Sequence, residues 1–328
     1  MKNYHCIPTI DTKMCSLSIG DHLTGFDENL HSLILTQLVE LAYKNNCKII
    51  YTAYILPDTI KNQYPDLSFY YKEELVGMCG WEELQNYQIH PEINYKNFIC
   101  SFNGSAHVSR KLLVAILKKF GYFSFDYCSK NFSYTPDIVD GHLLDYVGTD
   151  ETFYRKFFIS NESTDFCKTV NSFGNGLFEH NTQFFMPHEH TQNMNNLEFK
   201  ITESFLNIVS ETMATSYYPF VTEKFLYSIV TRGLFLSYAQ PGWHTHVEKY
   251  YGFKKYNKLF DYRFDTIQNP VKRLVEMITM ISKFSRLSVS DWHDLYLLEQ
   301  DTIEYNRDHY FSLGYRKYLD QQQLTSGN

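Results

Sequence analysis

The segment that is most informative about the fold is Phe220-Val-Thr-Glu-Lys-Phe-Leu-Tyr-Ser-Ile-Val-Thr-Arg-Gly-Leu-Phe-Leu-Ser-Tyr-Ala-Gln-Pro-Gly242. Apolar residues recur at helical spacing between Glu223 and Arg232, and the glycine that follows predicts the end of a helix. The apolar run Leu234–Tyr238 then predicts a strand. Lys224 is expected beside the free backbone amides of the helix start, an arrangement suited to binding a diphosphate.

Ordinary helix capping is the competing interpretation of this helix start. In that case Thr222 caps the helix, Glu223 favours the positive end of the helix dipole, and Lys224 is solvated. In an open α/β sheet, however, ligands bind at the carboxyl ends of strands and against helix N-termini. A strand predicted at Phe205–Ser210 ends shortly before the helix start. Lys224 would then neutralise a diphosphate, and Glu223 would accept hydrogen bonds from ribose hydroxyls.

The composition indicates a packed globular protein. The 328 residues are 44% hydrophobic and suffice for one large or two medium domains. The formal net charge of −7 argues against a broadly basic nucleic-acid or membrane surface. The seven cysteines are scattered without a Cys-x-x-Cys motif, which favours buried thiols in a reducing compartment. With no signal-peptide pattern and no apolar run of membrane-spanning length, we expect a soluble cytoplasmic protein.

Predicted strands and helices alternate along the chain, which is the rhythm of a parallel sheet. In the first part we expect, in order, a strand at Cys15–Ile19, a helix at Asp27–Lys44, and strands at Cys47–Tyr54 and Asn97–Phe102, followed by a helix at Ser109–Phe120. After the strand at Leu234–Tyr238 we expect helices at His244–Tyr251, behind the Asn269-Pro270 cap, and at Asp291–Tyr305. These segments predict two α/β domains at 1–155 and 156–305, with a C-terminal tail at 306–328, of which residues 321–328 are polar.

From about Phe205 to Arg273 the chain resembles the donor-binding half of fucosyltransferase-like glycosyltransferases, particularly the short forms carried by viruses. The shared pattern is an apolar strand, an acidic loop, an aromatic-Val/Ile-Thr-Glu-Lys helix start, a small or glycine stop, an apolar strand and a glycine. Here these are Phe205–Ser210, Glu211-Thr212, Phe220–Lys224, Gly233, Leu234–Tyr238 and Gly242, and Tyr251–Tyr262, Asp265 and Asn269–Arg273 look like the next segment of that family.

A second resemblance covers Phe98–Leu117, where phage-type relatives carry an apolar strand, an asparagine, a short polar loop, an arginine and a leucine-rich helix. Asn103 and Arg110 are the matching residues. The chain departs from the family in having Glu211-Thr-Met where Glu-Asn-Ser is usual, and this leaves the donor sugar open.

The resemblance implies a fold of two Rossmann-like domains in a GT-B-like arrangement, with a nucleotide cleft between them. It implies a nucleotide-sugar donor, and we expect that donor to be bound by Glu211, Thr222, Glu223, Lys224, Asn103 and Arg110. His244, in the loop after a predicted strand, could reach the sugar or a phosphate.

No divalent metal or separate cofactor is expected, and the nucleotide sugar is a co-substrate. The other glycosyltransferase architecture usually holds a metal with Asp-x-Asp, and this chain has no such pair. His188-Glu-His190 and His244-Thr-His246 have spacings that suit metal ligands in a strand or loop. Each pair is explained more simply as part of a polar loop or a loop-to-helix junction.

The general base for such a transfer is expected in the N-terminal domain, where a carboxylate or histidine would take the acceptor proton. The first strand-to-helix loop offers Asp21, His22, Asp27 and Glu28, all of which could instead be capping or first-turn residues. We select His22 or Asp21, because Asp27 already caps a predicted helix.

The leading hypothesis is a metal-independent glycosyltransferase that moves a sugar from a nucleotide sugar to an acceptor hydroxyl of a glycan, protein or modified DNA. One alternative is a glycosyltransferase that acts on modified DNA bases, which needs a local basic track. Another is an inactive sugar-binding or structural relative of the fold. The sequence leaves the donor, the acceptor, the stereochemistry of transfer and the oligomeric state open.

Overall fold

The structure, a computed structural model, describes residues 8–11, 16–19, 48–51, 69–71, 78–87, 92–103, 108–124, 126–130, 190–211, 214, 219 and 221–318. These residues form a mixed α/β architecture with two four-stranded sheets that share no strand. In the described part of the chain, no helix is long and apolar enough to cross a bilayer.

The larger α/β unit is built on a parallel sheet in the order β6-β5-β7-β8. Its strands are β5 (Asn97–Asn103), β6 (Cys128–Lys130), β7 (Ser204–Ser210) and β8 (Phe235–Tyr238). Every residue of β7 is buried, as expected for a central strand with both faces covered by helices. Because the strands are parallel, their carboxyl ends meet at one edge of the sheet.

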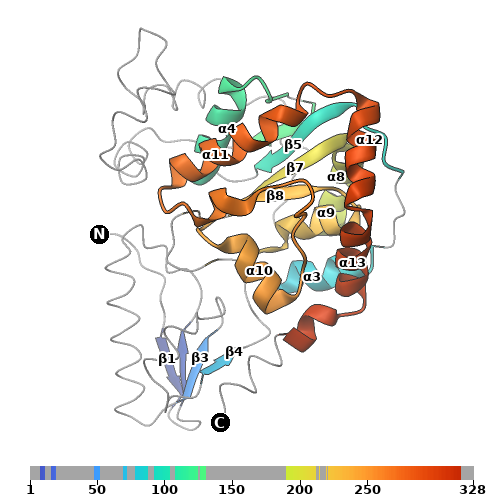
Figure 1. The fold of residues 1–328 in the computed structure, drawn as a ribbon. Helices are drawn as coiled ribbons and strands as arrows, with labels where there is room; N and C mark the ends of the chain where they lie inside the picture. The colour runs from blue at the N-terminus through green and yellow to red at the C-terminus, as the bar shows by residue number, and fades with distance from the viewer. Residues whose placement is uncertain are drawn as a thin grey trace.

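Helices cover both faces of this sheet (Figure 1). One layer contains α4 (Val108–Lys119) and α11 (Pro270–Ile281), which contact each other. The other contains α3 (Met78–Gln85), α8 (His190–Thr202) and the short pair η2 (Glu223–Phe225) and α9 (Leu226–Val230). The start of α11 is fixed locally, because the Asn269 side chain accepts hydrogen bonds from the backbone N–H of Val271 and Lys272.

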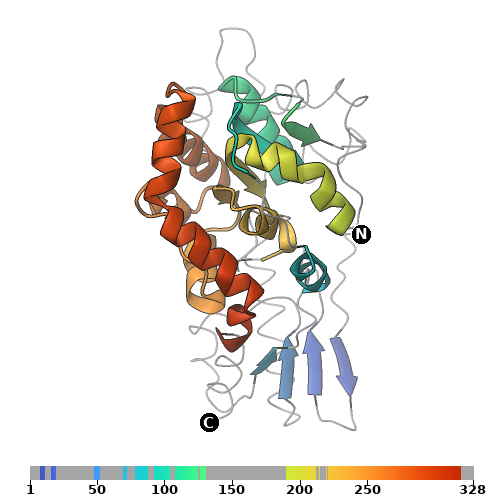
Figure 2. The same cartoon turned by 90° about the vertical axis from the view of Figure 1, so that its right-hand side faces the viewer.

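The remaining helical segments are α10 (Trp243–Tyr251), η3 (Tyr262–Thr266), η4 (Ser282–Phe284), α12 (Val289–Leu298) and α13 (Gln300–Phe311). Figure 2 shows α12 and α13 end to end along one side of the sheet. Trp292 of α12 stacks on Phe98 and Phe205, with ring centroids 5.9 and 5.7 Å apart. Both phenylalanines lie near the amino ends of their strands, so aromatic packing closes that edge.

The smaller sheet has the order β1-β2-β3-β4, with β1 antiparallel to β2 and the other pairs parallel. Its strands are β1 (Pro8–Asp11), β2 (Ser16–Ile19), β3 (Lys48–Tyr51) and β4 (Phe69–Tyr71). The predicted strands at Cys15–Ile19 and Cys47–Tyr54 correspond to β2 and β3. The helix predicted at Asp27–Lys44 lies outside the described residues.

The structure divides the chain differently from the sequence prediction. β5 pairs directly with β7, so a boundary between residues 155 and 156 would separate neighbouring strands of one sheet. The segment from β5 to β6 therefore belongs to the same unit as β7 and β8. The tail predicted at 306–328 is also wrong for residues 306–318, where Tyr310 and Tyr315 are fully buried.

The helix predictions agree with the structure in part. The helix expected at Asp291–Tyr305 is two helices, α12 and α13, which meet at Glu299. The predicted start of α11 at Asn269-Pro270 is confirmed, and so is the end of α10 at Gly252, which adopts a φ of 78°. The helix α8, which packs against β7, was not predicted.

Candidate functional site

Charged side chains gather where the carboxyl end of β7 meets the start of η2. We define the strand-end cluster as Arg110, Glu211, Thr222, Glu223 and Lys224. Glu211 follows the last residue of β7, and Thr222 is the N-cap of η2. Arg110 lies in the first turn of α4, the helix that follows β5. The parallel sheet thus brings together the two helix starts that the sequence analysis singled out.

The hydroxyl of Thr222 joins the two charged groups of opposite sign. It donates to Oε2 of Glu211 at 2.6 Å, and it accepts from Nζ of Lys224 at 3.0 Å. The backbone N–H of Thr222 donates to Oε1 of Glu211 at 3.2 Å. Both oxygens of the Glu211 carboxylate are therefore held by one residue, and the same hydroxyl positions the Lys224 ammonium.

The charged side chains Glu211, Glu223 and Lys224 have little contact with solvent. Glu211 is fully buried, and its loss of water raises the pKa of its carboxyl group, although the Lys224 charge and the bonds from Thr222 oppose the shift. Glu223 and Lys224 form an ion pair of 3.8 Å with side-chain exposures of 11% and 14%. Charges this far from water are expensive unless they are paired or bind a ligand of opposite charge.

Arg110 supplies a second cation, and this one is fully buried. It is 3% exposed, and burial lowers its pKa to about 10, while the charges of Glu211 and Glu223 act in the opposite direction. Its Nε atom is buried and has no hydrogen-bond partner among the residues that the structure describes. A buried guanidinium donor at a helix start is suited to an anion with several oxygen acceptors.

Asn103 is the last residue of β5 and lies on the same edge of the sheet. Its side chain is buried, and Nδ2 donates to Oγ of Ser101 at 3.2 Å. The structure therefore places Asn103, Arg110, Glu211, Thr222, Glu223 and Lys224 at the carboxyl ends of β5 and β7. The general-base candidates Asp21 and His22, together with Asp27, lie outside the described residues.

His244 lies at the start of α10, as predicted, but its ring is engaged inside the protein. Its Nδ1 lies 2.9 Å from Oδ1 of Asp265, and its Nε2 accepts from the backbone N–H of Ser237 at 3.1 Å. The ring is buried. Because Nε2 accepts a hydrogen bond, the ring proton is on Nδ1, which donates a hydrogen bond to the Asp265 carboxylate. Because both nitrogens are used inside the protein, His244 joins α10, η3 and β8 and does not reach for a sugar or phosphate.

Among the residues that the structure describes, no group of three or more His, Cys, Asp and Glu side chains is close enough to hold a metal ion. His246 is buried beside the rings of Tyr250 and Tyr251. His190 begins α8, whereas His188 and Glu189 lie outside the described residues.

Arg273 is a buried residue near this edge that was not among the predicted site residues. Nε donates to the carbonyl of Ala239 and Nη1 to that of Gln268, both at 2.9 Å, and Nη2 donates to the carbonyl of Ala214. It therefore ties the loop after β7 and the loop after β8 to the start of α11. An arginine within the apolar stripe of a predicted helix is the signal that could have identified it.

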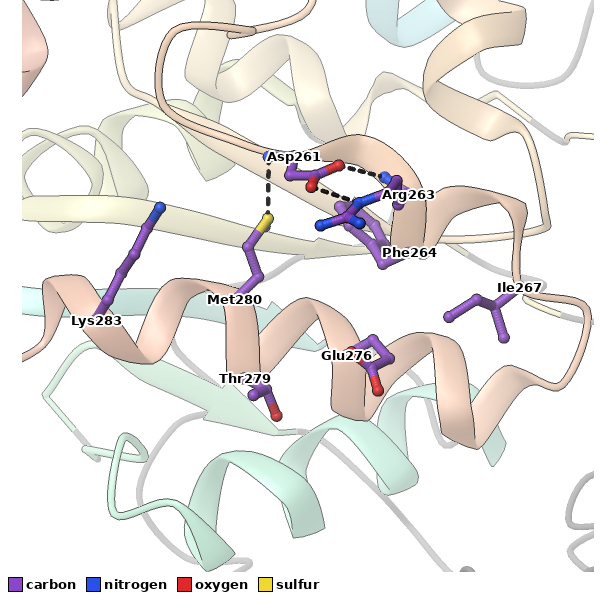
Figure 3. Close-up of a pocket in the computed structure, with 8 residues that line it drawn as sticks. All are labelled: Asp261, Arg263, Phe264, Ile267, Glu276, Thr279, Met280 and Lys283. Atoms are coloured by element: carbon purple, nitrogen blue, oxygen red, sulfur yellow. Dashed lines mark hydrogen bonds and ion pairs between the residues drawn. The ribbon is translucent and has the colours of Figure 1, made fainter.

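Two cavities bear on the location of a ligand. A cavity of ≈ 20 Å³ beside Lys224 and Asn207 has room for about one water molecule. A groove of ≈ 610 Å³ runs between η3 and α11, as Figure 3 shows, and is lined by Asp261, Arg263, Phe264, Ile267, Glu276, Thr279, Met280 and Lys283. In this groove Arg263 pairs with Asp261, two residues away, at 2.6 Å, and its side chain is 90% exposed.

Comparison with protein-family models, with curated proteins and with solved structures finds no match to this chain.

Proposed function

We propose that this protein is a metal-independent glycosyltransferase of the fucosyltransferase-like, GT-B type, which transfers a sugar from a nucleotide-sugar donor to an acceptor hydroxyl. One observation carries the proposal: two cations from separate helix starts, the buried Arg110 and the partly buried Lys224, share the carboxyl-end edge of a parallel sheet. This edge is where α/β proteins bind phosphorylated ligands. The resemblance of Phe205–Arg273 to the donor-binding half of that family supports the same assignment.

In this proposal the unit formed by β6-β5-β7-β8 is the Rossmann-like donor domain. The ribose hydroxyls of the nucleotide donate to Glu223, and the diphosphate lies against Lys224 and Arg110. The cavity beside Lys224 is far too small for a nucleotide, so the ligand would lie across the strand ends, where the neighbouring residues 104–107 and 215–218 are outside the described part of the chain. The chain before α3 would belong to the acceptor domain and would complete the two-domain arrangement.

The proposed reaction breaks the bond between the anomeric carbon and the diphosphate oxygen. The acceptor oxygen forms the new bond to that carbon, and its proton passes to a base, for which Asp21 and His22 are the candidates. The diphosphate leaves with the bonding electron pair and becomes more negative. Lys224 and Arg110 stabilise that added charge, which accelerates the transfer because they interact more strongly with the charge of the transition state than with that of the intact donor.

The test compares two lysine variants by calorimetric titration with the nucleotide sugar that most raises the melting temperature in a panel. Lys224→Ala should weaken binding about 10- to 100-fold, because a charge-assisted hydrogen bond contributes about 1.5–3 kcal/mol. Lys283→Ala, which removes a cation from the groove between η3 and α11, should leave binding unchanged. Equal affinities of wild type and Lys224→Ala, or a panel without any stabilising nucleotide, would overturn the proposal.

A further inference from the structure

The strand-end cluster contains as many carboxylates as cations. Glu211 and Glu223 face Arg110 and Lys224, so the cluster is close to neutral when all four groups are charged. An anion that binds to the two cations must share them with both carboxylates. Negative charge added at such short range disfavours a neighbouring carboxylate, so the cluster must respond when a diphosphate arrives.

The two carboxylates differ in how they can respond. Glu223 retains 11% side-chain exposure and can be stabilised by water or by ribose hydroxyls. Glu211 is fully buried, and both of its oxygens are bound by Thr222. Its carboxylate cannot turn to solvent without breaking those bonds. Glu211 is therefore the group whose charge is most difficult to keep beside a bound diphosphate.

We propose that Glu211 takes up a proton from solvent when a diphosphate binds at the strand-end cluster. The proposal rests on the glycosyltransferase function above and adds a positioning residue to it. The carboxylate becomes a carboxylic acid, and Oε2–H now donates to Oγ1 of Thr222, reversing the present hydrogen bond of 2.6 Å. That oxygen then has less capacity to accept from Nζ of Lys224, which it now does at 3.0 Å. Proton uptake thus turns the ammonium towards the ligand.

The surroundings of Glu211 support this behaviour. Burial already raises the pKa of its carboxyl group above the ordinary value in the absence of ligand. The charged or titratable groups that face it are Lys224 and Glu223 on η2, Arg110 on α4, and Tyr251 on α10. Tyr251 is kept protonated, because burial and the charge of Glu211 raise its pKa far above neutrality. A bound diphosphate would engage the two cations that now favour ionised Glu211.

The experiment titrates inorganic pyrophosphate calorimetrically into wild type, Glu211→Gln and Glu203→Gln in buffers of different ionisation enthalpy at one pH. The number of protons taken up on binding follows from the dependence of the heat on the buffer. Wild type should take up more protons than Glu211→Gln, by as much as about one per site. Protons that pyrophosphate itself gains or loses on binding contribute equally in all three proteins. Glu203→Gln is the matched control, because Glu203 pairs with Lys96 near the amino end of β7 and should behave as wild type.

The outcomes separate the two proposals. Equal proton uptake by wild type and Glu211→Gln, with pyrophosphate bound to both, overturns the role of Glu211 and leaves the anion site intact. Failure of pyrophosphate to bind wild type overturns the anion site and the proton uptake together. Should Glu211→Gln not fold, the pH dependence of wild type decides. The affinity of wild type for pyrophosphate should fall by up to about tenfold for each unit by which the pH rises, because Glu211 must be protonated in the complex. An affinity that rises with pH, as expected from the growing negative charge of pyrophosphate alone, would overturn the proposal.

Discussion

The strand-end cluster and the groove between η3 and α11 carry the same charges in different surroundings. Each contains two carboxylates and two cations: Glu211, Glu223, Arg110 and Lys224 in the first, and Asp261, Glu276, Arg263 and Lys283 in the second. The groove is much the larger space, at ≈ 610 Å³ against ≈ 20 Å³ beside Lys224. A search by volume alone would therefore select the groove.

Burial leads to the opposite choice. Arg263 pairs with a carboxylate two residues away and is almost fully solvated, so water and salt already stabilise its charge. Arg110 is buried beside two carboxylates from other elements, which requires a specific tertiary arrangement to offset its lost hydration. A charge that is buried in this way is a stronger indication of a ligand site than a charge that lines an open surface.

The largest expected difference is between Arg110→Met and Arg263→Met. Removing the buried cation leaves Glu211 and Glu223 with less compensation, and we expect a loss of about 3–5 kcal/mol in the free energy of unfolding. Removing the solvated cation should cost about 0–1 kcal/mol. Urea unfolding at neutral pH measures both, with the slope against urea checked for equality. Equal losses in the two variants would show that the strand-end cluster is no more demanding than the surface.

A smaller difference in the free energy of unfolding is expected between Thr222→Val and Thr279→Val. Thr222→Val removes the hydroxyl between Glu211 and Lys224 and leaves a buried carboxylate oxygen without its donor, which should cost about 1–3 kcal/mol. Thr279→Val changes an exposed residue of the groove and should stay within about 0.5 kcal/mol of wild type. Urea unfolding again compares them. If Thr222→Val is as stable as Thr279→Val, the hydroxyl does not organise the cluster.

Local chemistry predicted much of the fold. β7, β8 and the capped start of α11 follow from apolar runs and from the Asn269-Pro270 pair, because those signals act within a few residues. The pairing of β5 with β7 joins segments about a hundred residues apart and has no local signature. The predicted tail was wrong for a similar reason: Tyr310 is buried and its hydroxyl donates to the carbonyl of Trp81, 229 residues earlier in the chain, and no local pattern shows that contact.

The candidate site shows the same division. Thr222 and Lys224 were predicted together because helix-start chemistry is local, and Glu211 lies only 11 residues before Thr222. Arg110 entered through resemblance alone, since nothing in the residues around it shows that α4 begins beside η2. His244 was assigned wrongly because its partner Asp265 lies 21 residues away, and only the folded chain shows that both ring nitrogens are occupied.

The smallest expected effect concerns the pH dependence of the groove. The backbone N–H of Arg263, and then its side chain, lower the pKa of the Asp261 carboxyl group below its ordinary value. Asp261 therefore contributes stability above the pKa of the unfolded chain, and this contribution is lost as pH falls through the folded pKa. Asp261→Asn should thus lie slightly below wild type near pH 7 and converge with it near pH 3, and high salt should shrink the difference.

The contribution of Glu211 to stability should change with pH in the opposite direction. Its pKa is raised, so its contribution to stability is present at low pH and is lost as pH rises through the folded value. Relative to wild type, Glu211→Gln should therefore become more stable as pH rises, whereas Asp261→Asn becomes less stable. Urea unfolding between about pH 3 and pH 8 distinguishes the two slopes. Slopes of the same sign would mean that the two carboxylates occupy equivalent surroundings, and the distinction drawn from burial would not hold.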